Sequence, residues 1–417
     1  MPTDAERYAQ YRGARGRLAL PADSLIALTG VPYGLHPALS ALAGAWSAGE
    51  LAPVFNVGPL YAPTTKAQWR AAAPNSALIP QGLFSHADQQ VLWQSSGTSA
   101  RQRTGWGGRA ADVLATVNPV IAVGSVPRFG LSARKTPLVV PAPGANFGAY
   151  GLRSEDQALA PYAVRKRAID LLYAQPQDID LADTYRGMQI DSFAMSQRLG
   201  AIIAAQPGQQ AAFSAIDAAF LPLISDGRIT TSLGQQLYQV AKLIAANSML
   251  LGSRQLFFTE LAGFDTHGQQ VTEGRPTEGR HSQLLHELGE ALAAFHRAMQ
   301  ALGLAQAVTS FTQSDFGRTF KPNNSLGTDH AWGNHQLVLG GAVRGAATYG
   351  RYPELLLGGP DDVGVDSWDA QGRWIPGSSV DQYAATLLRW FGSSEEQLDE
   401  ILPNLKNFGD ARRLGFI

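Results

Sequence analysis

In the C-terminal half of the chain, short hydrophobic runs alternate with amphipathic segments. The runs have the length of strands, and apolar residues recur at helical spacing between them. The predicted strands cover residues 255–261, 305–312 and 337–340, and the predicted helices cover residues 281–302 and 380–391. Because this alternation is typical of βαβ units, it predicts an α/β fold with a mostly parallel sheet.

The N-terminal half shows the same two patterns less regularly. An apolar run at 52–57, ending at a Gly-Pro pair, predicts a buried parallel strand, and a second strand is predicted at 120–123. A helix is predicted at 5–17, where Asp4 is a candidate N-cap. Apolar spacing predicts further helices at 25–48, at 83–93, at 109–116 and within 211–246.

Periodicity is weaker between residues 124 and 210. Residues 124–155 are rich in glycine, proline and short apolar runs, which indicates an inserted β-rich excursion or a long functional loop. Residues 156–205 are expected to form two or three helices.

Composition excludes several classes of protein. The net charge is −1 and no block of like charges occurs, which argues against nucleic acid or an anionic membrane surface as the main partner. The absence of cysteine excludes thiolate zinc sites, iron–sulfur clusters and thiol nucleophiles. The sequence contains no run of about 18 apolar residues, so no transmembrane segment is predicted. The polar start of the chain does not resemble a signal peptide.

Carboxylates and imidazoles gather in three stretches that adjoin predicted strands. The chain has eight histidines, and six of them lie between His267 and His335. The stretches are Gly-Phe-Asp265-Thr-His267-Gly, Ser-Asp315-Phe-Gly-Arg-Thr and Gly-Thr-Asp329-His330-Ala-Trp-Gly-Asn-His335. Because strand ends gather at one edge of a parallel sheet, these loops predict a divalent-metal site. The alternative is a set of turns in which Asp265 caps the backbone and His267 is solvated.

Two further residues are candidates for contact with an anionic group. Arg318 can match a tetrahedral oxyanion with its planar fork, or it can pair with a structural carboxylate. Ser85 opens a predicted helix, where a serine hydroxyl acts either as a nucleophile or as a simple N-cap.

Longer stretches of the chain resemble one family. They are Leu-Phe-Ser-His-Ala-Asp-Gln-Gln, Arg-Thr-Gly-Trp-Gly-Gly-Arg, the three stretches above, Gly-Gly-Ala-Val-Arg-Gly and Ser-Val-Asp-Gln-Tyr-Ala-Ala-Thr-Leu. From about residue 4 to residue 408 the sequence resembles the domain of unknown function 1501 (DUF1501) family, which is placed in the alkaline phosphatase and sulfatase superfamily. The resemblance implies a single domain over 1–417, with a mostly parallel central sheet flanked by helices on both faces. Residues 124–210 are then an insertion or cap, and the protein is expected to be periplasmic or secreted.

The resemblance also assigns roles to residues. Asp265 and His267 match the ligands of a first metal site, and Asp315 matches a ligand of a second site. His330, or alternatively His335, matches the last histidine. Ser85 matches the nucleophile by position.

Two departures from the family pattern change the expectation. Phe316 stands where the superfamily often has a histidine after the later aspartate. Family members also begin with a hydrophobic strand ending in Gly-Gly-Asn-Asp, whose aspartate is a metal ligand, whereas this chain begins at what resembles the next segment. We therefore expect an N-terminally truncated domain that holds about half of the usual site.

The expected function is metal-dependent hydrolysis of a phosphate or sulfate ester of a small molecule or glycan. Mixed nitrogen and oxygen ligands favour zinc or manganese, and an oxygen-dominated site would favour calcium or magnesium. The alternative is a non-catalytic exported binding protein on the same fold, with a degenerate metal site.

Overall fold

The computed structural model describes residues 1–176, 178–250, 252–366 and 369–417. The α-helices are α1 Ala5–Arg15, α2 Ala43–Ser47, α3 Lys66–Ala71, α4 His86–Ser95, α5 Trp106–Val113, α6 Tyr162–Ala174, α7 Asp180–Ala204, α8 Ser214–Phe220, α9 Ser232–Ala245, α10 Asn247–Leu250, α11 Arg280–Ala301, α12 Val380–Phe391 and α13 Glu395–Ile401. The strands are β1 Ile26–Ala27, β2 Gly34–Leu35, β3 Leu51–Gly58, β4 Ile121–Val123, β5 Leu138–Val140, β6 Ile224–Ser225, β7 Arg228–Ile229, β8 Phe257–Phe258, β9 Ser310–Phe311, β10 Asn334–Leu339 and β11 Ser378–Ser379. Among the described residues, no helix combines the length and apolar character needed to cross a membrane.

The α/β class is confirmed, but the prediction of one mostly parallel central sheet is wrong for the described residues. Two separate sheets lie in the body of the molecule. One has the order β5-β4-β8 and is parallel throughout. The other has the order β11-β3-β10-β9, in which β10 runs antiparallel to both of its neighbours. The sequence pattern identified most of these strands but carried no information about which edges pair.

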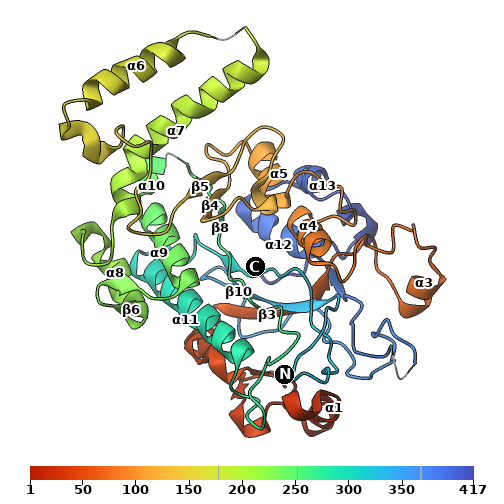
Figure 1. Ribbon diagram of the computed structural model, residues 1–417. Coiled ribbons are helices and arrows are strands. Elements are labelled where there is room, and N and C mark those ends of the chain that lie inside the picture. Colours follow the sequence, from red (N-terminus) through yellow and green to blue (C-terminus); the bar gives the residue numbers. More distant parts are fainter. Residues whose placement is uncertain (177, 251, 367–368) are drawn as a thin grey trace.

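Helices cover both faces of these sheets, as Figure 1 shows. Neighbouring strand residues point in opposite directions, so Leu51 packs into one hydrophobic cluster and Ala52 into another. The first cluster includes the buried faces of α8, α9 and α11. The second includes Trp93 of α4, Trp106 of α5 and the buried face of α12. Burial on both faces explains why β3 is apolar almost throughout.

Helices α1 and α12 were predicted correctly because their capping residues are visible in the sequence. Asp4 accepts a hydrogen bond from the backbone N–H of Arg7 at 3.0 Å and begins α1. Helix α12 has the predicted bounds, because a capping box between Ser379 and Gln382 begins it and Gly392 ends it in the left-handed region. The helix predicted at 25–48 is wrong. That segment forms the short strands β1 and β2, a 3-10 helix and only the five-residue α2.

Residues 124–210 belong only partly to the body of the molecule, in which β5 pairs with β4 and the C-terminal end of α7 packs into the first hydrophobic cluster. Residues 124–155 form one short strand, β5, within turns and 3-10 helices. Helices α6 and α7 then form a long hairpin, which Figure 1 shows projecting from the remainder of the chain. Several large apolar side chains on this hairpin are exposed, including Leu171, Leu172 and Leu181.

Candidate metal centre

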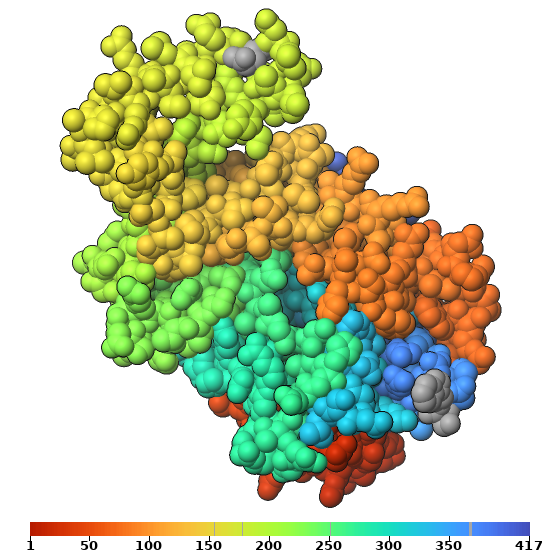
Figure 2. Space-filling view, viewed as in Figure 1, coloured from red at the N-terminus to blue at the C-terminus, as the bar shows by residue number. Residues whose placement is uncertain are grey.

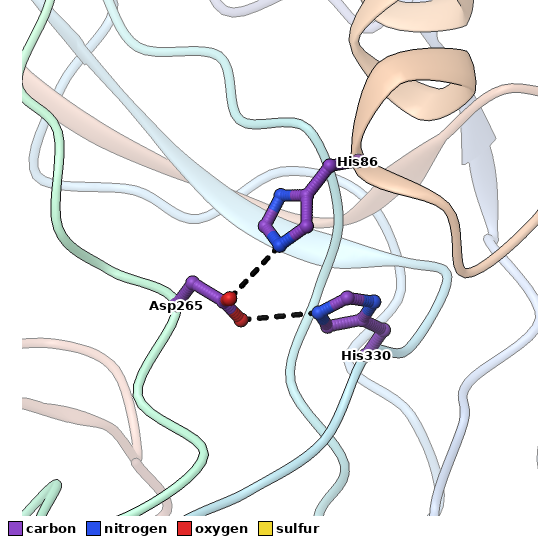
Figure 3. Close-up of side chains that lie close together, drawn as sticks. All are labelled: His86, Asp265 and His330. Atoms are coloured by element: carbon purple, nitrogen blue, oxygen red, sulfur yellow. Dashed lines mark hydrogen bonds and ion pairs between the residues drawn. The ribbon is translucent and has the colours of Figure 1, made fainter.

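Asp265 is the centre of a cluster formed by three segments that are distant in the sequence. It lies in the loop that follows β8, and His267 lies in the same loop. His86 is the first residue of α4. His330 belongs to the loop before β10, where it forms an isolated antiparallel bridge with Arg318. Figure 3 shows the side chains of His86 and His330 directed at the two oxygens of Asp265.

The contacts around Asp265 are short. The Nε2 atom of His86 lies 2.9 Å from Oδ2 of Asp265. The Nε2 atoms of His330 and His267 each lie 3.0 Å from Oδ1. These two Nε2 atoms are 2.9 Å apart. Four side chains therefore direct nitrogen or oxygen atoms into one small volume.

This arrangement fits a divalent metal ion. Potential ligand atoms of His86, Asp265 and His330 all lie within 4.8 Å of one another. A tetrahedral ion with ligand distances near 2.1 Å separates its ligand atoms by about 3.4 Å. The observed contacts are slightly shorter, as expected for hydrogen bonds between the same groups. A small outward movement of the imidazoles would convert this network into a coordination shell.

The imidazoles are oriented by their second ring nitrogens. The Nδ1 atom of His267 lies 2.8 Å from Oδ1 of Asp329, and the Nδ1 atom of His330 lies 2.6 Å from the backbone oxygen of Phe84. These contacts hold both rings so that their Nε2 atoms face Asp265, and a neutral ring with its proton on Nδ1 presents Nε2 to a metal ion. Asp329, which belongs to the third of the predicted loops, therefore contacts a candidate histidine ligand.

A glycine lets these loops approach each other. A Cβ atom on Gly327 would lie 2.2 Å from the backbone oxygen of His267. Only a residue without a side chain allows the loop of Asp329 and His330 to pack this closely on the loop of His267.

Arg318 lies against the same carboxylate. Its Nη1 atom is 2.6 Å from Oδ1 of Asp265, and its Nε donates to Oγ1 of Thr328 at 3.1 Å. Partial burial raises the pKa of Asp265, but hydrogen bonds from Arg318, His86 and His330 outweigh it and hold that pKa far below its usual range. Asp265 is therefore an anion that already has a cation beside it.

Asp315 and Phe316 lie next to the cluster, on the side of α4. Asp315 accepts a hydrogen bond from Gln90 at 3.4 Å, and burial raises its pKa to about 6, with Glu260 adding to the rise and His86 opposing it. The ring of Phe316 stacks on His330 with ring centroids 4.2 Å apart and meets His86 edge-on. Phe316 thus fills with a hydrocarbon ring the space beside both imidazoles.

Ser85 and His335 occupy different positions relative to this cluster. Ser85 is the N-cap residue of α4, its side chain makes no capping hydrogen bond, and it directly precedes His86. His335 lies on β10, where its Nδ1 accepts a hydrogen bond from the backbone N–H of Asn56 at 3.1 Å. Its ring packs against Phe55 and Tyr352. The structure therefore brings Asp265, His267, His330 and Arg318 together and leaves His335 apart.

His86 was not predicted to be a metal ligand. Its neighbour Ser85 was a candidate because it opens a helix, and the same position directs His86 at Asp265. The available signal was a histidine at a helix start beside a candidate nucleophile. Nothing local indicates that this helix start faces the end of β8.

The comparisons with known proteins place the chain in a family. A model of the DUF1501 family, described as a protein of unknown function, matches residues 146–361. Since this match covers more than half of the chain, the protein belongs to the DUF1501 family. The matched part includes Asp265, Asp315, Arg318 and His330 but not Ser85 or His86. No curated protein and no solved structure matched the chain.

The burial of a second histidine pair, His36 and His281, predicts that stability depends on pH. Burial lowers the pKa of His36 to about 4 and that of His281 to about 3. An unfolded chain binds protons at these rings near pH 6.5, so the free energy of unfolding decreases as the pH falls from 6.5 toward 4. We expect His281→Gln to recover about 1 kcal/mol at pH 5, allowing for partial exposure of the ring. Urea denaturation in the presence of a chelator measures this difference.

The exposed His286 on the same helix provides the control. His286→Gln should leave the pH dependence unchanged. Equal slopes for the wild type and His281→Gln would contradict the assignment of acid sensitivity to His281.

Proposed function

We propose that this protein is a divalent-metal-dependent hydrolase of phosphate or sulfate esters. The observation that supports this best is the convergence of His86, His267 and His330 on the carboxylate of Asp265, with Arg318 beside it. A metal ion and a guanidinium next to each other provide two positive groups for a tetrahedral oxyanion.

In this proposal, His86, Asp265 and His330 are ligands of the ion, and His267 is the fourth ligand. A bound zinc ion would polarise the ester oxygen and lower the pKa of an adjacent water or hydroxyl. Asp329 keeps the ring of His267 in place through its 2.8 Å contact with Nδ1. Asp315 orients this set or serves a second ion. The mixed nitrogen and oxygen donors favour zinc or manganese over calcium or magnesium.

Ser85 and Arg318 act on the substrate. The hydroxyl of Ser85 has no capping bond to break, and it lies beside the ligand His86. Its oxygen would attack phosphorus or sulfur, the ester bond would break, and the alcohol would leave with a proton. Water would then release phosphate or sulfate and restore Ser85. Arg318 would stabilise the charge on the equatorial oxygens during both steps.

Turnover of aryl phosphate and aryl sulfate tests this proposal. With zinc or manganese added, we expect release of the phenol from one of the two esters. Ser85→Ala should lower kcat by more than about 100-fold. It should leave the affinity for zinc within about threefold, because Ser85 is not a ligand.

Ser192→Ala is the matched control, since Ser192 is exposed on α7 and far from the cluster in sequence. It should retain full activity. Unchanged kcat in Ser85→Ala would remove Ser85 from the mechanism. Absence of turnover with both esters and each of the four divalent ions would overturn the proposed activity.

A second candidate function is that of a non-catalytic binding protein with a degenerate metal site. It is favoured by the contact of Arg318 with Asp265, because an arginine that already neutralises this carboxylate competes with a metal ion. In this case a sulfated or phosphorylated glycan should bind with the same affinity before and after chelation, and no ester should be hydrolysed.

The proposal extends to the organisation of the chain. We propose a single domain over 1–417, in which residues 124–210 form a cap that contributes to the choice of a small-molecule or glycan ester. By family resemblance we propose a periplasmic or secreted location. The family match begins inside this cap region, at residue 146.

A further inference from the structure

The helical hairpin formed by α6 and α7 carries apolar side chains that the body of the molecule does not cover. Figure 2 shows the hairpin as a separate lobe, in yellow and yellow-green, at the top of the molecule. Of the 17 large hydrophobic side chains that are exposed among the described residues, eight lie between residues 164 and 190. A group of exposed apolar side chains on one element usually marks an interaction surface.

Helix α7 has two apolar sides. Its inner side packs on α6, where the ring centroids of Tyr173 and Phe193 are 6.2 Å apart. Its outer side carries Leu181, Tyr185 and Met188, which are all exposed. These three residues follow one another at steps of four and three residues, which is the spacing of a coiled-coil seam.

The outer side of α6 repeats this pattern. Val164, Ala168 and Leu171 follow one another at steps of four and three residues, and all three are exposed. A helix that is apolar on two sides is normally buried on both of them. The exposure of these side chains shows that the described part of the chain fills neither outer seam. Each helix of the hairpin therefore presents a seam suited to packing against another helix.

Charge is distributed unevenly along the hairpin. The tip, where α6 ends and α7 begins, has no basic residue between residues 168 and 185. Its acidic residues are Asp170, Asp178, Asp180 and Asp183. The basic residues at the base of the hairpin are Arg165, Lys166, Arg167 and Arg198. Asp170 and Asp183 pair within the hairpin, with Lys166 at 2.7 Å and Arg186 at 2.8 Å, whereas Asp178 and Asp180 are exposed at the tip.

We propose that the hairpin is a homodimer interface, in which the hairpins of two copies of this chain pack antiparallel through their outer seams. A two-fold axis brings the acidic tip of each hairpin to the basic base of the other, so both ends are complementary. A parallel arrangement would place the two acidic tips side by side. An anionic membrane surface would repel the acidic tip, so a second copy of the chain fits the charges better. This inference does not depend on the proposed hydrolysis.

Sedimentation equilibrium of the full chain at low salt, between about 1 and 100 µM, tests the proposal and should show a dimer. Leu181→Glu places a charge in the seam of α7 and should weaken dimerisation by more than about 100-fold. A glutamate in the first turn of α7 is compatible with the helix, so circular dichroism should show unchanged helix content. Val164→Glu is the equivalent variant in the seam of α6. Leu221→Glu, at an exposed position outside the hairpin, is the matched control and should dimerise as the wild type does.

Charge reversal tests the antiparallel orientation. Replacing both Arg165 and Arg167 by glutamate should weaken dimerisation by about 10-fold or more, and so should replacing both Asp178 and Asp180 by lysine. A chain that carries all four substitutions should regain the affinity of the wild type within about threefold, because its tip and base again have opposite charges. In a parallel dimer the same four substitutions would leave like charges side by side.

Three results would overturn the proposal. The first is a monomer at every concentration, and the second is a dimer that both Leu181→Glu and Val164→Glu leave intact. The third is a monomer that binds vesicles of phosphatidylcholine and phosphatidylglycerol, because the outer seams would then contact a membrane. If the chain with four reversed charges fails to regain affinity, the antiparallel arrangement is wrong.

Discussion

Replacing Asp265 by asparagine will weaken the binding of Zn²⁺ by more than about 100-fold, beyond the 10- to 100-fold typical of changes to groups behind the ligands. Its carboxylate contacts the Nε2 atoms of His86, His267 and His330 within 3.0 Å. An amide in its place removes the negative charge that a divalent ion needs and offers only one oxygen. Titration calorimetry on chelator-treated protein measures the change.

Asp23→Asn is the control for this prediction, because Asp23 is exposed and belongs to a short 3-10 helix. It should bind Zn²⁺ as the wild type does. Loss of the anion also leaves Arg318 without its partner, so a thermal melt must show that the Asp265 variant is folded. Equal affinities in the wild type and Asp265→Asn would exclude Asp265 as a ligand.

The substitution Lys242→Met will produce a large loss of stability. Lys242 is fully buried, and its Nζ donates to the backbone oxygens of Ile202 at 2.7 Å and Ala205 at 2.6 Å. These oxygens lie at the end of α7, where helix carbonyls lack partners in the helix. Leaving them unpaired costs about 1–3 kcal/mol each, and removing a buried charge offsets part of this cost. We expect the free energy of unfolding to fall by about 3 kcal/mol at pH 7.

Lys242 also makes the free energy of unfolding depend on pH in a predictable way. Burial lowers the pKa of Lys242 to about 7, with Asp217 opposing the shift. Between pH 7 and 9 the unfolded chain binds more protons at this amine than the folded chain, so the stability of the wild type rises with pH. The Met variant lacks this rise, and the difference between the two proteins should widen.

Urea denaturation at pH 7, 8 and 9 measures both effects. Lys166→Met, which removes a solvent-exposed pair with Asp170, is the control and should change stability by no more than about 0.5 kcal/mol. A loss below 1 kcal/mol at pH 7 in Lys242→Met would contradict the role of Lys242 as a cap of α7.

Structural features that depend on neighbouring residues were predicted from the sequence, whereas features that depend on contacts between distant segments were not. Helix α12 was predicted with its observed bounds, because its cap and its terminal glycine lie within a few residues of the helix. The segment 25–48 was mispredicted because Gly34 and Pro37 divide a helix-like apolar pattern into short strands and a 3-10 helix. Its side chains pack against α11 rather than along one helix of their own.

The candidate site shows the same division. Asp265, His267 and His330 were selected because their residue types follow or precede strands, and the structure places them together. His86 was not selected as a ligand, because the start of α4 reaches Asp265 only through the packing of α4 beside the loops after β8 and β9.

By itself, the sequence determined the α/β class, most helices, the strands β3, β4, β8, β9 and β10, and the residue types of three loops suited to metal and oxyanion chemistry. These depend on periodicity, capping and turn residues, which act within about one turn or one strand. Only the tertiary structure decided that His86 joins Asp265, that Arg318 neutralises it, and that His335 lies apart. It also decided how the described strands pair, in one four-stranded, one three-stranded and two two-stranded sheets. Such outcomes depend on contacts between distant segments, whose energies are summed over the whole core and leave no local pattern.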